Sequence, residues 1–252
     1  MFGLERNWKS NMKNIQLRGV IHTAKEQWKK SKILKCIDAI VNYHYRRNLK
    51  NDGFTILCSN CIGGTISHRF GKRFLSPTIN LYLTQADFIQ FCVYLDYYLP
   101  QKLVFIDTDK NHPVAELHGD GKNIPTITIY FNHAKTNLEA EEAWNRRKAR
   151  VNRDNLYIIL YYLDGLSIDD LKKLETVKCN NKVVFTAKHL PDISWSYYIK
   201  PNMNHKYPYN YLEKNVFGIR YFERYFNIIE FLNASAPIKD TNEYYCKTNK
   251  RC

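Results

Sequence analysis

The sequence has no apolar run long enough to cross a membrane, and its first residues do not form a secretory signal. A spanning helix needs roughly 20 consecutive apolar residues, whereas the longest good candidate, Leu156 to Leu163, has the length of a strand. Residues 1–8, Met-Phe-Gly-Leu-Glu-Arg-Asn-Trp, lack both an apolar core and a small-residue cleavage site. We therefore expect a cytoplasmic protein.

Cysteines are few and irregularly spaced, and they form neither a disulfide framework nor a complete zinc motif. There are seven of them, and an odd number argues against systematic pairing. Cys58 and Cys61 form a C-x-x-C pair, but no second pair and no nearby H-x₃₋₅-H motif accompanies it. We therefore expect no metal site, and a thioredoxin-like redox role for this pair is an alternative.

Acidic residues are scarce relative to basic ones, and the positive excess is concentrated near the N-terminus. The 38 lysines and arginines outnumber 24 aspartates and glutamates, for a net charge of +14. Residues 1–52 alone hold twelve basic and four acidic residues. Such a field favours phosphates, anionic lipid head groups or acidic glycans, although a solvated basic face explains it equally. No nucleic-acid-binding motif is present, so nucleic acid is not an expected partner.

What the chain does contain is the rhythm of strands and helices typical of an α/β protein. A length of 252 residues with 44% apolar content is sufficient for a large core. We predict strands at 54–58, 103–107, 113–117, 124–131, 155–161 and 182–185, and helices at 63–70, 84–99, 137–151, 167–174 and 221–232. The expected fold is a layered, mostly parallel sheet flanked by helices.

We divide the chain into three regions. Residues 1–50 form a basic helical N-terminal extension, residues 51–235 the α/β domain, and residues 236–252 a polar C-terminal tail. The extension either packs over the sheet or rests on an anionic membrane surface at the inner face of the membrane.

Residues 54–64, Phe-Thr-Ile-Leu-Cys-Ser-Asn-Cys-Ile-Gly-Gly, are the most informative segment. A short apolar run ends in a polar turn that carries Cys61, and two glycines follow at once. A buried strand that delivers a small reactive side chain to its carboxyl end is a common way to build a site in an α/β protein. A helix N-terminus or an imidazolium would stabilise a thiolate there. Cys61 is therefore the candidate nucleophile, and a small buried cysteine in a tight turn is the alternative.

Two histidines are candidates for the general base. His133 follows the alternating segment 124–131, so we expect it near other strand ends if that part of the sheet is parallel. His68 lies seven residues after Cys61, about two helical turns farther along, and is the second candidate.

Other residues near the predicted strand ends are candidates for binding. Glycine lets backbone amides approach a bound oxygen, so an oxyanion or phosphate cradle is expected at Ser59, Asn60, Gly63 and Gly64. Asp164, in a turn after a strand, is placed to orient a base or to bind a sugar hydroxyl, and Arg146 is placed to hold a phosphate. A plain turn and a helix-dipole role explain these last two residues as readily.

Six short segments together carry a resemblance to known proteins. They lie between residues 50 and 235 and are 59–64 (Ser-Asn-Cys-Ile-Gly-Gly), 76–81, 144–148, 153–156, 182–186 and 225–233. In them the chain resembles an uncharacterised bacterial family found among exopolysaccharide and capsule biosynthesis proteins, a domain of unknown function. That family usually has a second aromatic residue after the strand-end histidine, where this chain has Ala134.

The resemblance implies a transferase of bacterial surface polysaccharide biosynthesis (capsule, exopolysaccharide or O-antigen). Acyl transfer, with acetyl-CoA as donor and no tightly bound cofactor, is the reaction it suggests. The acceptor would be a hydroxyl of a glycan or of a lipid-linked glycan. Cys61 would then take the acyl group and His133 would activate the sugar hydroxyl. The basic surface would hold coenzyme A phosphates or keep the enzyme at the inner membrane face.

Two other functions fit the sequence. A glycosyltransferase or phosphotransferase with a nucleotide-linked donor would need an acidic metal-binding pair, and Asp107-Thr108-Asp109 matches D-x-D but lies in a charged loop. A non-catalytic glycan-binding assembly protein would stack sugars on the aromatic tail, which also suits core packing; its aromatic residues include Trp195, Tyr197, Tyr198, Tyr207, Tyr209 and Tyr211. The sequence specifies neither the acceptor sugar nor the oligomeric state.

Overall fold

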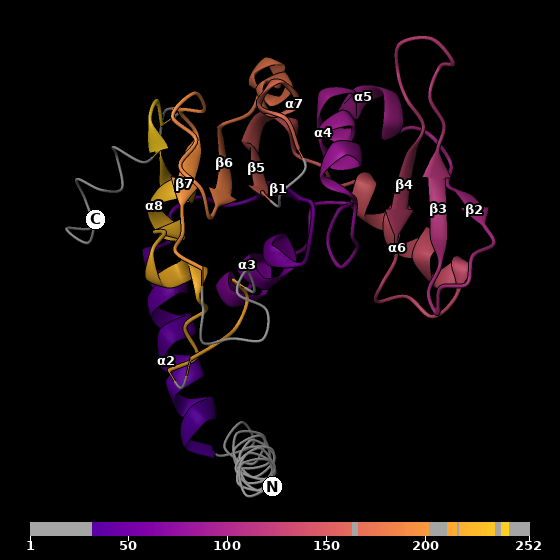
Figure 1. Cartoon of the computed structure of the whole chain (residues 1–252). Coiled ribbons are helices and arrows are strands. Elements are labelled where there is room, and N and C mark those ends of the chain that lie inside the picture. The colour runs from indigo at the N-terminus through magenta and orange to yellow at the C-terminus, as the bar shows by residue number, and fades with distance from the viewer. Residues whose placement is uncertain (1–31, 163–165, 202–210, 216, 235–237, 242–252) are drawn as a thin grey trace, which may run out of the picture.

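The computed structural model describes residues 32–162, 166–201, 211–215, 217–234 and 238–241, and it contains two sheets (Figure 1). The larger sheet has the order β1-β5-β6-β7, and all three of its strand pairs are parallel. Its strands are β1 (Thr55–Cys58), β5 (Leu156–Tyr161), β6 (Asn181–Thr186) and β7 (Ser196–Tyr198). The predicted α/β fold with a mostly parallel sheet is confirmed.

The smaller sheet is antiparallel and lies beside the larger one. Its order is β2-β3-β4, with strands β2 (Val104–Ile106), β3 (Val114–Leu117) and β4 (Ile127–Tyr130). One face of β4 is buried because Ile127 and Ile129 point into the core, while Thr128 and Tyr130 are partly exposed. This alternation is what a sheet with one solvated face requires.

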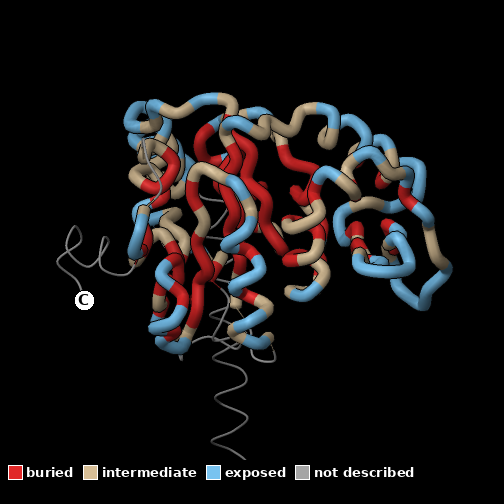
Figure 2. The backbone as a smooth tube through the Cα atoms, turned by 90° about the horizontal axis from the view of Figure 1, so that it is seen from above, coloured by how far each residue is buried: buried red, intermediate tan, exposed pale blue. Residues whose placement is uncertain are grey.

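Both faces of the parallel sheet are covered, which explains the continuous apolar run of β5. In β1, Ile56 and Cys58 join a core with α2 (Lys32–Asn48), α3 (Ile62–Phe70) and α8 (Ile228–Asn233). Leu57 points to the opposite face. That face packs against the smaller sheet and against α4 (Gln85–Val93), α5 (Leu95–Tyr98), α6 (Asn137–Lys148) and α7 (Ile168–Lys172). Figure 2 shows the buried residues concentrated in the central strands.

Helix caps form largely where the sequence places them. Thr84 Oγ1 accepts a hydrogen bond from Asp87 N (3.1 Å) at the start of α4, and Ser167 Oγ accepts one from Asp170 N (3.0 Å) at the start of α7. The predicted single helix 84–99 is wrong, because the backbone leaves helical geometry at Tyr94 and divides it into α4 and α5. Phe91 and Leu95 are both buried, so the apolar stripe continues across the break and hides it in the sequence.

The last third of the chain departs most from the prediction. The predicted helix 221–232 is a 3₁₀ turn, Phe222–Arg224, followed by the short α8. Asn227 begins α8 and its Oδ1 accepts a hydrogen bond from Glu230 N (3.2 Å). The edge strand β7 was not predicted, since three residues give too little alternation to identify a strand. The parts of the extension and tail at 1–31 and 242–252 lie outside the described residues.

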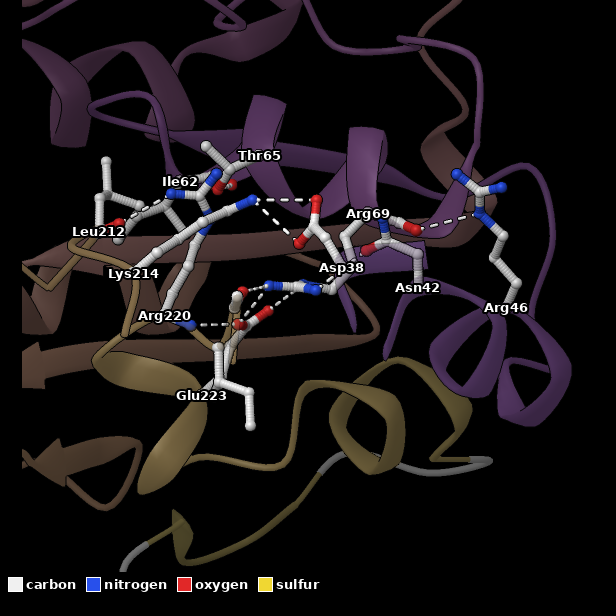
Figure 3. A network of polar contacts seen from close by, with 12 residues as sticks. Asp38, Asn42, Arg46, Ile62, Thr65, Arg69, Leu212, Lys214, Arg220 and Glu223 are labelled. Atoms are coloured by element: carbon white, nitrogen blue, oxygen red, sulfur yellow. Dashed lines mark hydrogen bonds and ion pairs between the residues drawn. The ribbon is translucent and has the colours of Figure 1, made fainter. Parts of the chain in front are cut away.

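A buried polar network joins α2, α3 and the segment 211–224 (Figure 3). Arg69 on α3 forms an ion pair with Glu223, with Nε 2.5 Å from Oε1 and Nη2 2.8 Å from Oε2. The same guanidinium donates to Asn42 Oδ1 (2.9 Å) and to Gly218 O (2.6 Å). Arg46 Nε donates to Arg69 O (3.2 Å). These contacts fix α3, and therefore the turn from which it starts, against two other parts of the chain.

Candidate functional site

Cys61 lies at the start of α3, three residues after the end of β1. Its carbonyl accepts the first helical hydrogen bond, from Thr65 N (3.0 Å), and its side chain makes no capping bond. The thiol is half-buried, and this burial raises its pKa above the ordinary value. At neutral pH the resting group is therefore a protonated thiol, which needs a base to become a nucleophile.

His133 provides an imidazole within reach of this thiol. The distance between His133 Nε2 and Cys61 Sγ is 3.5 Å, and the imidazole is exposed to solvent. A nucleophile beside a base at hydrogen-bonding range is the basic arrangement of covalent catalysis. The two residues are 72 positions apart in the sequence, so the fold alone brings them together.

The connection between the two sheets determines where His133 lies. Tyr82 and Tyr130 pair through two hydrogen bonds of 2.9 Å, in an isolated antiparallel bridge at the end of β4. The residue after Tyr82 completes the link, because Leu83 N donates to Ser59 O (3.2 Å) in the turn after β1. The segment 82–83 therefore joins the end of β4 to the turn that carries Cys61, and His133 follows only three residues after Tyr130.

We expected His133 near other strand ends on the condition that this part of the sheet is parallel. That condition is not met, because β4 belongs to the antiparallel sheet. The bridge at Tyr82 takes the place of parallel pairing, and no local feature of the sequence indicates it.

Cys58, the other cysteine of the C-x-x-C pair, has a different environment. It is fully buried under α3, and this burial raises its pKa to about 11, although the backbone amides of Asn60, Gly63 and Ile62 act in the opposite direction. Its Sγ donates to Asn60 Oδ1 (3.3 Å), and the same oxygen accepts a hydrogen bond from Ile62 N (2.9 Å). Both cysteines are free thiols. Asn60 thus holds the turn between them.

Gly63 and Gly64 lie within the first turn of α3, not in an open loop, and both are buried. A Cβ on Gly64 would lie 3.0 Å from Asn80 Oδ1 and 3.2 Å from Ile79 Cγ2. The absence of a side chain on Gly64 therefore makes room for Ile79 and Asn80. A Cβ on Gly63 would lie 3.3 Å from Cys58 Cβ. Their main structural contribution is therefore close packing at the start of the helix.

Asn80 is a further candidate for the site, one that we did not identify from the sequence. Its φ of +61° is the one positive value among the described non-glycine residues, and such backbone is strained and concentrated at functional sites. Its side chain lies over Gly64, which is one helical turn from Cys61 and therefore on the same side of α3. The amide is partly exposed, so it is available to a molecule bound beside the thiol.

The remaining predicted residues are distributed differently. Ser59 is buried and contributes its carbonyl to the link with Leu83. His68 is exposed in the last turn of α3, and no described contact joins it to Cys61. Arg146 is exposed at the C-terminal end of α6. Asp164 lies outside the described residues.

Two further features lie away from the thiol. A cavity of about 610 Å³ opens between α4 and the loop joining β3 to β4, where Tyr94, Lys122 and Lys173 contribute to its lining; it contains neither Cys61 nor His133. Asp107 and Asp109 of the D-x-D match are exposed in the loop after β2. Within the described part of the chain, no three histidine, cysteine, aspartate or glutamate side chains gather closely enough to hold a metal ion.

The fold and the site define an α/β protein with a thiol–imidazole pair at the junction of a parallel and an antiparallel sheet. The chain belongs to the family described as "Domain of unknown function (DUF1919)", whose model matches residues 21–233. It is also similar to a protein of Haemophilus influenzae described as "Uncharacterized protein", with 36% identity over 171 residues that cover 68% of this chain and 80% of that protein.

The family match extends farther than the resemblance found in the sequence. It begins at residue 21 and so includes α2, whereas we had placed residues before 50 outside it. The contact of Arg46 with α3 agrees with this wider boundary.

As to membranes, none of the helices in the described ranges has the length and apolar character needed to cross one.

Proposed function

We propose that this protein is a transferase that moves an acyl group through a thioester on Cys61 to a glycan hydroxyl. The observation that carries this proposal is the 3.5 Å approach of His133 Nε2 to a half-buried, protonated thiol. The glycan as acceptor, and a role in surface polysaccharide assembly, rest on the resemblance described in the sequence analysis.

The first half-reaction loads the enzyme. His133 Nε2 accepts the thiol proton as Cys61 Sγ attacks the carbonyl carbon of an acyl thioester such as acetyl-CoA. The tetrahedral intermediate collapses with cleavage of the bond between that carbon and the donor sulfur. The departing thiolate takes the proton from the imidazolium and leaves as free coenzyme A, and the acyl group stays on Cys61.

The second half-reaction transfers the group. His133 accepts the proton of the glycan hydroxyl while its oxygen attacks the carbonyl carbon of the acyl-cysteine. The bond between that carbon and Cys61 Sγ breaks, and the thiolate recovers the proton from His133. The exposure of the imidazole suits this step, because the acceptor has to reach it from solvent.

The negative charge that develops on the carbonyl oxygen needs a donor in both half-reactions. The start of α3 supplies the positive end of a helix dipole beside Cys61. Asn80 lies over Gly64 through its Oδ1, and its Nδ2 is the side-chain donor for this role. We assign the oxyanion to these two groups.

The test is incubation of the full chain with acetyl-CoA, followed by mass spectrometry of the Cys61 peptide. We expect an acetyl group on Cys61, none in Cys61→Ala, and loading slowed by about 10²–10⁴-fold in His133→Gln. His68→Gln is the matched control and is expected to load at the wild-type rate. Full coenzyme A release by Cys61→Ala would overturn the mechanism.

The acceptor is tested separately with a purified surface glycan. Release of the acetyl group from preloaded enzyme should accelerate when the glycan is added. A melting-temperature increase with a nucleotide sugar and Mn²⁺, in the absence of any loading by acetyl-CoA, would instead support transfer from a nucleotide-linked donor. Glycan binding without turnover of either donor would support an assembly role.

A further inference from the structure

Four arginines from two parts of the chain gather beside the candidate site. Arg146 and Arg147 lie in the last turn of α6, Arg150 follows directly after it, and Arg73 lies in the loop after α3. Burial and then Arg146 and Arg150 lower the pKa of Arg147. Desolvation and then Arg73 and Arg146 lower the pKa of Arg150. Arg150 is therefore within electrostatic range of the other three arginines, one of which, Arg73, lies outside α6.

The arginines of this cluster have no acidic partner in direct contact within the described part of the chain. None of its members forms an ion pair there, whereas Arg69 pairs with Glu223 and Arg153 with Asp96. Cations in the last turn of a helix complement its dipole, which accounts for positive charge on α6. That effect does not account for Arg73, which lies in the loop after α3. A bound anion would reduce the repulsion between the positive charges of these arginines.

One member of the cluster connects it directly to the site. Arg147 is half-buried and its Nη1 donates to Ile79 O (2.6 Å). Ile79 and Asn80 are the two residues that pack over Gly64, one turn from Cys61. A ligand that contacts the arginines and extends along this segment would therefore reach the thiol.

We propose that Arg73, Arg146, Arg147 and Arg150 bind a diphosphate group carried by a substrate of the Cys61 site. A guanidinium binds phosphate through two parallel hydrogen bonds, which a lysine cannot reproduce. The bond to Ile79 holds Arg147 in place before the ligand arrives, which reduces the entropy lost on binding. This assignment rests on the proposed function for the identity of the site, and two substrates carry the group: coenzyme A and a lipid-linked glycan.

The first experiment measures binding of inorganic pyrophosphate to the full chain by isothermal titration calorimetry at low salt. Arg150→Ala is expected to weaken binding at least tenfold, and Arg150→Lys to weaken it less. Arg47→Ala, which removes an exposed arginine on α2, is the matched control and is expected to change binding less than twofold. Binding should also weaken as salt is raised. Equal affinities of Arg150→Ala and Arg47→Ala, or no saturable binding by the wild type, would overturn the proposal.

The second experiment identifies the source of the diphosphate. Coenzyme A and a soluble short-chain prenyl diphosphate are each added in competition with pyrophosphate, and the compound that displaces it at lower concentration carries the group. Displacement by neither compound contradicts the assignment.

Cys61→Ala separates this inference from the proposed reaction. The variant should bind pyrophosphate as tightly as the wild type. If acetyl loading fails while binding still depends on Arg150, the acyl-transfer proposal fails and the diphosphate site stands. If Cys61 is acetylated normally while binding does not depend on Arg150, the reverse holds.

Discussion

The protonation of Cys61 distinguishes two ways in which a thiol–imidazole pair can work. In one, the pair exists at rest as a thiolate and an imidazolium; in the other, the base removes the proton only during attack. Burial raises the pKa of Cys61, which disfavours a charged thiolate at rest, and His133 is exposed to water. These environments favour the second mechanism.

The reactivity of the thiol toward iodoacetamide should therefore depend steeply on pH. Because the reactive thiolate is the minor form below the pKa, the alkylation rate of Cys61 is expected to rise about tenfold per pH unit from pH 6 to 8.5. Peptide mapping by mass spectrometry measures this rate separately for each cysteine. Cys58, with a pKa of about 11 and no exposure, is the internal control and should remain unlabelled in the folded protein. A rate that is already constant between pH 6 and 8 would show a preformed ion pair.

Asn80 combines two properties that a single substitution can separate. Its positive φ is strained for most residues but not for glycine. Asn80→Gly therefore keeps the backbone and removes the amide, and we expect unchanged or slightly higher stability together with slower loading of Cys61. Asn80→Ala removes the amide and adds strain, so it should also lose about 1 kcal/mol of stability. Thermal unfolding and the acetyl-loading assay measure the two effects, and wild-type loading by Asn80→Gly would remove Asn80 from the site.

At the scale of elements, α3 is the part on which the site depends. Its first turn packs against Asn80 through Gly64, and its last turn enters the polar network through Arg69. The side chains of Arg69 and Glu223 are 4% and 2% exposed. A buried pair of this kind contributes little as a pair, but the loss of one partner leaves an uncompensated charge.

Replacing one partner of the Arg69–Glu223 pair should therefore destabilise the fold more than replacing both partners together. Arg69→Met is expected to lower the free energy of unfolding by about 3–5 kcal/mol, and Arg69→Met combined with Glu223→Leu by less than the sum of the single changes. Urea denaturation gives both values. The control is Lys72→Met. Lys72 lies two residues after α3 and contacts Asp52 at the surface, so its loss should change the free energy of unfolding little. An additive double variant would show that the two side chains act independently.

At the scale of the whole molecule, the two sheets share one core. The face of the parallel sheet that carries Leu57, Ile158 and Val184 packs into the same cluster as Ile129 of the smaller sheet and Trp144 of α6. The smaller sheet is thus part of the same packed body as the parallel sheet, and it carries one of the two reactive groups.

Sequence patterns predicted the parts of this architecture that depend on local chemistry. The predicted strand 155–161 agrees with β5, and the predicted helix start at residue 84 agrees with the Thr84 cap of α4. The break at Tyr94 and the strand β7 were missed because neither changes the apolar pattern over enough residues to be detected.

The candidate site was predicted in its residues but not in its construction. Cys61 and His133 each follow a predicted strand, and this position made them candidates; that they meet depends on a pairing of Tyr82 with Tyr130 that only the three-dimensional structure shows. Asn80 has no distinctive sequence context, since its importance comes from its backbone angle and from the space above Gly64. Arg73 joins the arginines of α6 only through tertiary proximity.

The bridge between Tyr82 and Tyr130 has a consequence for how easily the candidate site can be lost. A shift of that pairing by one residue would move the chain by about 3.3 Å and turn its side chains to the opposite face. This displacement is close to the 3.5 Å that separates Cys61 Sγ from His133 Nε2. Substitutions at this junction would therefore separate Cys61 from His133 while both residues stay in the sequence. The distance between the thiol and the imidazole thus depends on residues other than these two.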